Sequence, residues 1–453
     1  MKDKKEGMKA YYGITFLIGL GFFTMGLMDP LYDTYVPIFL KNFLSRDGLV
    51  GSLMGLDNLF AILLIPVFSA LSDRTRTAIG RRMPYIIICL PLTAIFFALL
   101  PSAALKSLGF LIILIFLLNL VKQAARGPVV ALMPDIIPGE YRSEANGIIN
   151  TMGGIAAIVG TVGLAKLYDV NISLPIIGKT IKEFPHLLEG RNATYIGSLP
   201  FLIAAVLVVL ATLLLFLFVK EKKQPLESEE EKKVPIIKSI KYIFTSGDKS
   251  VLLILISLLL WFIGYQGVLP WIGLYGVNSL GLSPGTAGLS AGMVGIAYAV
   301  FAIPSGILAH KIGRKKVIRF ALMGVAIIVT LLFLHQPLMT MLGITGMAAV
   351  AIFWGLLFVF GIFWGSIVTN SFPMLWQMAS YTTMGIYTGL YYFFSQMAGV
   401  IAPILTGGLR DAFGPRVVFL VSAIFMVAAF FTMSGVTRGE PGEEPADHSE
   451  TKI

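Results

Sequence analysis

Long apolar runs alternate with short polar segments along the whole chain. A bilayer core of about 30 Å needs about 20 apolar residues in a helix. Runs of about this length occur twelve times, at residues 11–40, 49–71, 84–101, 107–133, 143–167, 194–219, 250–275, 286–309, 317–334, 343–369, 383–405 and 416–436. The pattern predicts an all-α polytopic membrane protein with twelve transmembrane helices.

The first run is the least regular, because it contains Asp29, Asp33 and two prolines. If the span ended at Met28, Asp29 would be an ordinary interfacial residue. The next basic residue is Lys41, so we favour the longer span, which places Asp29 near the middle of the membrane. Neighbouring helices and water can satisfy the carbonyls that the prolines free. The run is too long for a signal peptide and has no small-residue cleavage site.

Two basic loops of similar sequence lie at matching places in the two halves of the chain. The first is LSDRTRTAIGRRMP at residues 71–84, and the second is GILAHKIGRKKV at residues 306–317. Their glycines, Gly80 and Gly313, lie 233 positions apart, about half of the 453-residue chain. A charged loop repeated between apolar segments is typical of duplicated membrane transporters.

The repeat and the charged segments divide the chain. We expect six-helix bundles at residues 1–219 and 250–436, joined by a cytoplasmic linker at 220–249. The linker begins with the solvated run KEKKQPLESEEEKKVP and continues into a segment that is predicted to form an amphipathic helix. The acidic tail at 437–453 is predicted to be disordered.

Composition agrees with a lipid environment. The chain is 56% hydrophobic and 13% charged, with a mean hydropathy of +0.83, whereas a soluble domain is about a quarter charged. The single cysteine, Cys89, excludes a disulfide framework and a thiolate metal site. We expect no cofactor and no bound metal.

The net charge of +10 does not require a nucleic-acid partner. Of the 35 Lys and Arg residues, 24 lie in or beside segments on the side of the termini and nine on the opposite side. Basic residues concentrate on the cytoplasmic side of membrane proteins. This bias predicts a cell-membrane protein with both termini in the cytoplasm.

Five ionisable residues lie within the predicted spans, all in the first half: Asp29, Asp33, Asp57, Lys122 and Arg126. Such groups are costly in a membrane and usually line a polar cavity. Three carboxylates face two cations, so one carboxylate is left over and should bind a proton or a metal cation. We assign cation coupling to Asp57 and Asp29, and the sequence does not show which pairs form.

The second half offers amides and aromatic residues instead of charges. Carboxylates, amides and guanidinium groups bind hydroxyls, and aromatic faces stack on a sugar ring, so the two halves together suit a neutral polyhydroxylated ligand. The aromatic residues also fit interfacial belts and core packing. The predicted substrate-binding residues are Asp29, Tyr32, Asp33, Asn58, Asn119, Lys122, Arg126, Asn150, Trp261, Tyr265, Gln266, Tyr392 and Gln396.

The basic loops also have two interpretations. Basic residues set topology, but Asp73 adds nothing to that signal, so we favour a conformational latch in which Asp73 caps or pairs across the two halves. His310 takes the corresponding place in the second loop, so that latch should be weaker. The predicted latch residues are Asp73, Arg74, Gly80, Arg81, Arg82, Gly313 and Arg314.

Four runs of the first half resemble a known family: MGLDN (54–58), SDRTRTAIGRRMP (72–84), ARGPVVALMPD (125–135) and RSEANGIINTMGG (142–154). They are similar to the sucrose-transporter-like branch of the major facilitator superfamily, which is related to the glycoside–pentoside–hexuronide cation symporters. The second half matches only in its GRKK loop and general pattern. The resemblance implies a twelve-helix, two-bundle carrier that moves a sugar together with a proton or sodium by alternating access.

The resemblance also bears on single residues. It places Asp29 near a sugar-binding aspartate on the first helix of melibiose-type carriers. The acidic pair that forms their sodium site on the second helix is absent, because the matching positions are Ala61 and Ile65, with Asp57 about one turn earlier. This difference favours a proton over sodium as the transported cation.

We therefore expect a monomeric secondary transporter for a sugar or glycoside, with proton symport. One alternative is a carrier of the same fold for a drug, a nucleoside or an organic anion. The other is a membrane-embedded enzyme using the aspartates as acid–base groups. No GxGD or HExxH motif accompanies these aspartates, and no GxxxxGK[ST] loop indicates a nucleotide-driven pump.

Overall fold

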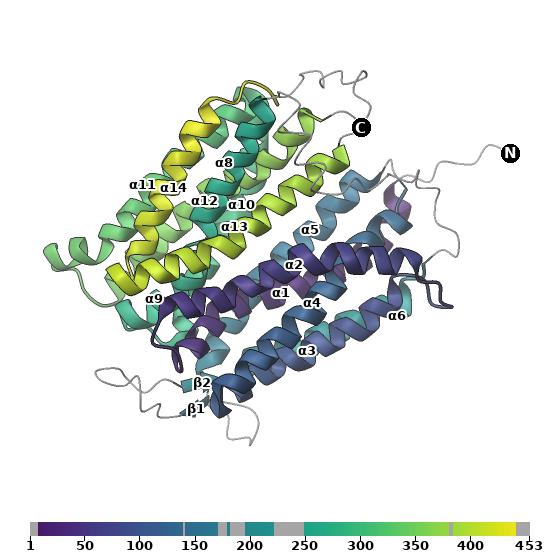
Figure 1. Cartoon of the computed structure of the whole chain (residues 1–453), viewed down its shortest axis with the longest axis horizontal. Coiled ribbons are helices and arrows are strands. Elements are labelled where there is room, and N and C mark those ends of the chain that lie inside the picture. The colour runs from purple at the N-terminus through teal and green to yellow at the C-terminus, as the bar shows by residue number, and fades with distance from the viewer. Residues whose placement is uncertain are drawn as a thin grey trace. The chain divides into compact units, whose positions relative to one another are not determined.

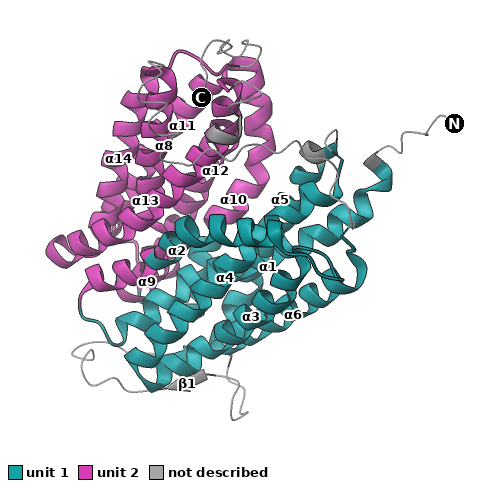
Figure 2. Cartoon of the chain, turned by 45° about the vertical axis from the view of Figure 1, so that its right-hand side comes forward, with its two compact units in different colours: residues 1–45, 56–229, 281–292 teal, residues 46–55, 230–280, 293–453 magenta. Residues whose placement is uncertain are grey.

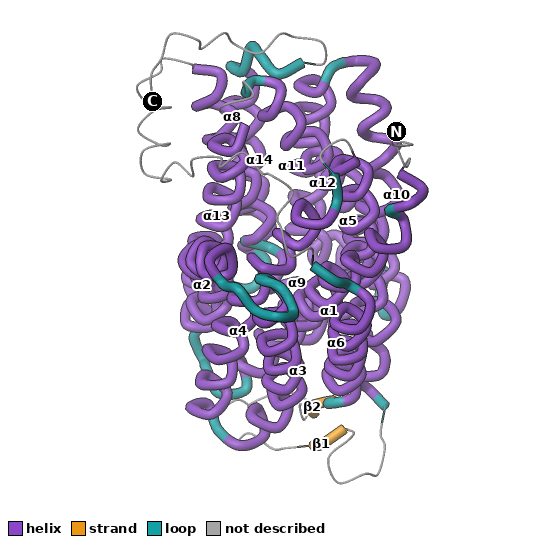
Figure 3. Tube along the Cα trace, turned by 90° about the vertical axis from the view of Figure 1, so that its right-hand side faces the viewer, coloured by secondary structure: helices purple, strands orange, loops and turns teal. Residues whose placement is uncertain are grey.

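The structure of the chain is a computed structural model that describes residues 8–138, 141–170, 179–181, 195–221, 249–379 and 384–440. The predicted amphipathic segment of the linker and most of the tail lie outside these residues. Figures 1 and 3 show that the described chain is almost entirely helical. The first half contains η1 (Met8–Ala10), α1 (Tyr12–Lys41), α2 (Asp47–Arg74), α3 (Met83–Lys106), α4 (Leu108–Ile136), α5 (Arg142–Ile158), η3 (Val159–Leu164), η4 (Ala165–Asp169) and α6 (Leu199–Phe218).

A two-stranded antiparallel sheet, β1 (Lys179–Ile181) and β2 (Tyr195–Gly197), lies between η4 and α6. The second half contains α8 (Lys249–Gln266), α9 (Leu269–Leu280), α10 (Pro284–Ile312), α11 (Arg314–Met341), α12 (Met347–Gln377), α13 (Met384–Phe413) and α14 (Val417–Ser434). Twelve of the described segments are long and apolar enough to span a membrane, which confirms the predicted number. The seventh span, Lys249–Leu280, consists of α8 and α9 together.

The longer form of the first span is confirmed. Helix α1 continues through Pro30 and Pro37 without a break, and Asp29 lies near its middle. The fifth span is less regular, because α5 passes into the π-helical segment η3 and then the 3-10 turn η4. Such departures from α geometry are frequent beside functional sites.

The chain divides into two compact units (Figure 2). In unit 1, α1 packs on α5 and α6, and α3 packs on α4 and α6. Helices α1 and α5 approach closely because glycines line their contact: a Cβ on Gly26 would overlap the Gly153 carbonyl, and one on Gly160 would lie 2.9 Å from the Leu27 carbonyl oxygen. Small residues permit such approaches between membrane helices.

In unit 2, α11 packs on α12 and α14, and α8 packs on α13 and α14. Its core includes the buried rings of Tyr275, Phe353 and Phe419, with Tyr275 5.5 and 5.2 Å from the other two. The chain remains ordered beyond α14, since the Thr437 amide donates to Ser250 Oγ at 3.1 Å.

The boundary between the two units does not coincide with the midpoint of the sequence. Residues 46–55, at the start of α2, cluster with unit 2, whereas the rest of α2 belongs to unit 1. Residues 281–292, at the start of α10, cluster with unit 1, whereas the rest of α10 belongs to unit 2. Each half of the sequence thus contributes one short helical segment to the other unit.

Candidate functional site

Three helices of unit 1 bring together the ionisable residues predicted from the sequence. The Lys122 ammonium, on α4, lies 3.0 Å from Asp29 Oδ1 on α1 and 2.9 Å from Asp57 Oδ1 on α2. The lysine side chain is only 5% exposed, and those of Asp29 and Asp57 are 33% and 18% exposed. One buried cation therefore forms ion pairs with two partly accessible carboxylates.

Amides complete this cluster. Gln123 Nε2 donates to Asp57 Oδ1 at 2.5 Å, and Asn119 Nδ2 donates to the Tyr32 hydroxyl at 3.1 Å. The Lys122 ammonium also lies 5.3 Å from the centre of the Tyr32 ring. The side-chain oxygens of Asn119 and Gln123 are buried, and neither has a hydrogen-bond partner among the described residues. Because both residues are fully buried, a hydroxyl could reach these two acceptors only after the surrounding side chains move.

Asp33 and Arg126 complete the set of five charges. Asp33 follows Asp29 by one turn of α1 and is half-buried, within electrostatic range of Asp29, Asp57 and Lys122. Arg126 follows Lys122 by one turn of α4 and interacts electrostatically with Asp57. No ion pair or hydrogen bond joins either side chain to another described residue. Asp33 is thus the carboxylate of the cluster without a direct cationic partner in the described part of the chain.

Two predicted polar residues of unit 1 stand apart from these contacts. Asn58 is half-buried beside Asp57 on α2, and its side chain makes no hydrogen bond to another described residue. Asn150 is exposed on α5, where its Nδ2 donates to the Asn146 carbonyl at 2.8 Å and to Asn146 Oδ1 at 3.0 Å. The structure therefore brings neither residue into direct contact with Lys122.

One predicted aromatic residue of unit 2, Tyr265, belongs to a stacked pair. Tyr265 on α8 lies 3.9 Å from Trp364 on α12 with the ring planes 2° apart, and Phe360 is stacked 6.0 Å from Tyr265. Phe262 meets Trp364 edge-on at 5.3 Å. Flat aromatic faces of this kind can stack on the apolar face of a ring-shaped solute.

A hydroxylated edge adjoins the aromatic pair. Phe262 also meets Tyr391 of α13 edge-on at 6.1 Å. The Tyr391 hydroxyl shares a hydrogen bond of 3.0 Å with Ser371 Oγ. Tyr392 is 58% exposed and lies 6.0 Å from Tyr391. Unit 2 therefore combines aromatic surface with neutral hydrogen-bonding groups.

The remaining predicted residues of unit 2 differ in accessibility. Gln266, at the end of α8, and Gln396, one turn after Tyr392, are half-buried. Trp261 is fully buried, and its indole N–H has no hydrogen-bond partner among the described residues. A solute could reach Trp261 only after the surrounding helices move.

Gln123, Trp364 and Tyr391 were not among the predicted substrate-binding residues. Gln123 follows Lys122 directly, and both side chains reach Asp57. The available signal for Gln123 was its place among the polar residues of the fourth span, directly after Lys122 and four residues after Asn119. Trp364 and Tyr391 resemble ordinary core residues in the sequence, and their role depends on neighbours from other helices.

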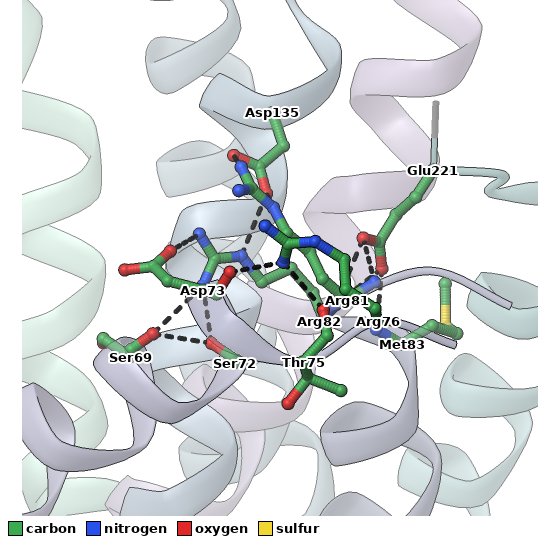
Figure 4. Close-up of polar contacts among 10 residues, drawn as sticks. All are labelled: Ser69, Ser72, Asp73, Thr75, Arg76, Arg81, Arg82, Met83, Asp135 and Glu221. Carbon is green, nitrogen blue, oxygen red and sulfur yellow. Dashed lines mark hydrogen bonds and ion pairs between the residues drawn. The ribbon is translucent and has the colours of Figure 1, made fainter. Parts of the chain in front are cut away.

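Three of the predicted latch residues of the first loop, Asp73, Arg81 and Arg82, lie in a compact polar network within unit 1 (Figure 4). Arg81 binds both carboxylate oxygens of Asp135, at 3.0 and 2.5 Å. Arg82 donates to Asp135 Oδ2 at 2.9 Å and also pairs with Asp73. Asp73 therefore pairs inside its own loop in this conformation, and Arg74 is exposed.

Glu221, just beyond α6, binds the start of α3 in the same network (Figure 4). Its carboxylate accepts hydrogen bonds from the amides of Arg81, Arg82 and Met83 at 2.7 to 3.1 Å. Gly80 has a φ of +113°, which turns the chain so that these amides converge. Burial by itself lowers the pKa of Arg81, but the hydrogen bond and charge of Asp135 raise that pKa above its ordinary value.

The second loop repeats this arrangement in unit 2. Gly313 has a φ of +101°, and the Glu440 carboxylate accepts from the amides of Arg314 and Lys315 at 2.6 and 3.1 Å. Arg314 also donates to the Gly439 carbonyl at 3.3 Å. A negative charge at the N-terminus of a helix is favourable in both loops. Neither glutamate was singled out from the sequence, since each lies outside the basic loop that it binds.

The comparison with known families shows what kind of protein contains the Lys122 cluster and the two loop networks. The model of the Major Facilitator Superfamily matches residues 13–403 and 277–452. The chain belongs to the Major Facilitator Superfamily. It is therefore a multi-pass membrane transporter, as the twelve apolar spans predicted. The search of curated proteins found no match to the sequence of this chain.

Solved structures of other transporters share the fold of this superfamily member. A D-xylose-proton symporter is 14% identical, with a TM-score of 0.67 over 96% of this chain and 99% of its own. A point mutant of the nucleoside transporter NupG is 11% identical, with a TM-score of 0.65 over 93% and 100%. A bacterial homologue of the human lysosomal transporter Spinster, inward-facing and occupied, is 13% identical, with a TM-score of 0.69 over 97% and 100%.

Proposed function

We propose that the protein is a proton-coupled symporter for a sugar or glycoside, working as a monomer in the cell membrane with both termini in the cytoplasm. The charge cluster around Lys122 is the observation that carries the proposal. Its three aspartates, one lysine and one arginine have a net charge of −1 when all are ionised. One bound proton makes the cluster neutral, and a neutral cluster is far less costly inside a membrane protein.

The contacts favour Asp33 as the residue that binds this proton. Asp29 and Asp57 both have the Lys122 ammonium within 3.0 Å, and Asp57 also accepts from Gln123. These contacts stabilise the two ionised carboxylates. Asp33 has no comparable contact among the described residues, so protonating it disrupts no ion pair. The sequence had instead pointed to Asp57 and Asp29, which remain the alternatives.

The polar groups support a neutral, hydroxylated substrate. The partly accessible carboxylate of Asp29 can accept from two hydroxyls at once. The unpartnered side-chain oxygens of Asn119 and Gln123 could accept from further hydroxyls once the buried cluster opens. The Tyr265–Trp364 pair supplies an aromatic face for a sugar ring. An anionic solute would meet a cluster that carries no surplus positive charge.

A nucleoside is the second candidate, because the same aromatic pair can stack on a nucleobase. The two candidates differ in the ring that stacks, so competition separates them. A free pentose or disaccharide inhibits uptake of a sugar substrate, whereas a free nucleobase inhibits uptake of a nucleoside.

Uptake into proteoliposomes tests the proposal. Labelled mono- and disaccharides should accumulate under an inward proton gradient, and an uncoupler should abolish accumulation, whereas a sodium gradient should have no effect. Asp33→Asn should lose accumulation but keep exchange of labelled for unlabelled sugar, because the neutral cluster no longer needs the proton. Asp57→Asn is the matched comparison and should impair both.

Two results would contradict parts of this proposal. If Asp57→Asn, and not Asp33→Asn, spares exchange while abolishing accumulation, the proton binds at Asp57. If no sugar accumulates under either gradient while a nucleoside does, the substrate class is wrong and the coupling assignment can be retested with that nucleoside.

A further inference from the structure

One cation of unit 2, Arg319, has no anionic partner among the described residues. It lies five residues after Arg314, the first residue of α11, and is half-buried. Its guanidinium is 4.6 Å from the centre of the Phe430 ring on α14, which packs beside α11 (Figure 1). Its Nε is buried, and within the described chain the side chain has neither a hydrogen bond nor an ion pair. The ring covers one face of the guanidinium but accepts none of the N–H groups at its edge.

The helices around Arg319 cannot supply an anion. Helix α11 packs on α12 and α14, and these three helices contain no aspartate or glutamate. The Glu440 carboxylate, beyond α14, instead accepts from the amides of Arg314 and Lys315. Lys315 Nζ donates to the Ser434 carbonyl at 2.9 Å. Because an unpaired cation within a membrane span is costly, Arg319 requires an anion from outside these helices.

The depth of Arg319 in the membrane matches that of lipid phosphates. Helix α11 has 28 residues. At 1.5 Å per residue it is about 42 Å long, so a hydrocarbon core of about 30 Å leaves about 6 Å of helix at each end. Arg319 lies about 7.5 Å along the helix, at the boundary between headgroups and hydrocarbon, and an arginine there extends toward the headgroups. Eight spans precede α11, so this end lies on the side of the chain termini.

A second cation and two exposed aromatic rings adjoin this position. Lys316 lies one turn before Arg319 on the same face of α11, is exposed, and has no partner within the described chain. Phe320 follows Arg319 directly and is 72% exposed, and Phe431 follows Phe430 and is 67% exposed. Cations beside exposed apolar rings match a ligand that joins a phosphate to acyl chains, whereas a soluble phosphate would leave the rings uncovered.

We propose that unit 2 binds an anionic phospholipid between α11 and α14, on the membrane side of the chain termini. The phosphate accepts two parallel hydrogen bonds from the Arg319 guanidinium, and the Lys316 ammonium contributes a second positive charge. The acyl chains lie along Phe320 and Phe431. A lipid with net negative charge is preferred to a zwitterionic lipid, because no cation of its own headgroup offsets its phosphate.

Native mass spectrometry of the full chain in detergent tests the proposal with phosphatidylglycerol as the probe. The parent protein should retain one tightly bound phosphatidylglycerol. Arg319→Gln should bind this lipid about tenfold or more weakly, because both guanidinium hydrogen bonds are lost. Arg319→Lys should fall between the two, since it keeps the charge but not the paired donors. Phosphatidylcholine should bind weakly, with no dependence on Arg319.

Arg74→Gln is the matched control, because Arg74 is exposed at the end of α2, on the same membrane side but in unit 1. It should leave the affinity for phosphatidylglycerol unchanged. Lys316→Gln should weaken binding severalfold, and it provides the test if Arg319→Gln does not fold, since Lys316 is exposed.

Three results would overturn the proposal. The first is equal affinity for phosphatidylglycerol in the parent, Arg319→Gln and Lys316→Gln. The second is displacement of the lipid by glycerophosphoglycerol, its headgroup without acyl chains, at similar concentrations, which would assign the site to a soluble phosphate. The third is a dimer that Arg319→Gln abolishes while lipid binding is unchanged, which would assign the site to a second copy of the chain. None of these results depends on the transported solute.

Discussion

Replacing Lys122 by methionine should strongly destabilise the protein. The substitution keeps an unbranched side chain of similar length but removes the ammonium that lies within 3.0 Å of Asp29 and Asp57. Two carboxylates would then face each other without a cation in direct contact. Their mutual repulsion and incomplete hydration raise the free energy of the folded state, whereas the unfolded state is hardly affected.

The size of the effect follows from the burial of the three groups. Removing one partner of a fully buried ion pair costs about 3–5 kcal/mol. Here the lysine is 5% exposed but the carboxylates are 33% and 18% exposed, so solvent reduces the penalty. We expect a loss of about 2–4 kcal/mol in the free energy of unfolding.

A thermodynamic cycle isolates the interaction. Lys122→Met, Asp57→Asn and the double variant are compared by tryptophan fluorescence during denaturant unfolding in detergent. The double variant should be more stable than Lys122→Met alone, with a coupling energy of about 1–3 kcal/mol, because it no longer contains an unpaired Asp57 carboxylate. Lys106→Met, on an exposed residue at the end of α3, should change stability by less than about 0.5 kcal/mol.

Two outcomes would refute this reasoning. If Lys122→Met is as stable as the parent, the ammonium does not hold the two carboxylates together in the folded protein. If the double variant is less stable than Lys122→Met, the Asp57 carboxylate of the folded protein is stabilised by Gln123 and not by Lys122. Either result would also weaken the assignment of the proton to Asp33, which assumes that Lys122 stabilises the other two carboxylates.

Further predictions concern the loops and the aromatic pair. Glu221→Gln should lower the thermal midpoint by the equivalent of about 1–2 kcal/mol, because a charged acceptor for three amides is lost, and Glu440→Gln should act similarly in unit 2. Fluorescence-monitored melting checks both, and an unchanged midpoint would show that the contacts are dispensable. Trp364→Leu should raise the KM for a sugar about tenfold with less effect on kcat, since it removes a stacking face; an unchanged KM would exclude that face from binding. Arg82→Lys should reduce transport because lysine cannot bind Asp73 and Asp135 together, whereas Arg74→Lys, on an exposed residue, should not.

The sequence predicted the architecture because the signals for it are local. Length and apolarity of each run gave the twelve spans, and the position of Lys41 gave the correct length of the first span. The basic loops were also visible as a repeat. The partners of Lys122 were not predictable, because Asp29 and Asp57 lie on different helices and helical spacing relates only residues on the same helix. Glu221 and Glu440 were missed for the same reason, since each acts on a helix that is distant in sequence.

The two halves of the chain have the same kind of polar contact at the ends of their helices and different side chains in the middle of the helices. Both have a carboxylate on the amides that follow a loop glycine, Gly80 or Gly313, and both have a carboxylate on the first turn of α2 or α10. These contacts involve backbone amides, which every residue except proline supplies, so they tolerate divergence of the surrounding side chains. In the middle of the helices, unit 1 has charged side chains and unit 2 has stacked aromatic rings. These features depend on the side chains and not on the backbone. The two halves of the chain therefore keep the same contacts at their helix ends while the side chains at their centres have diverged.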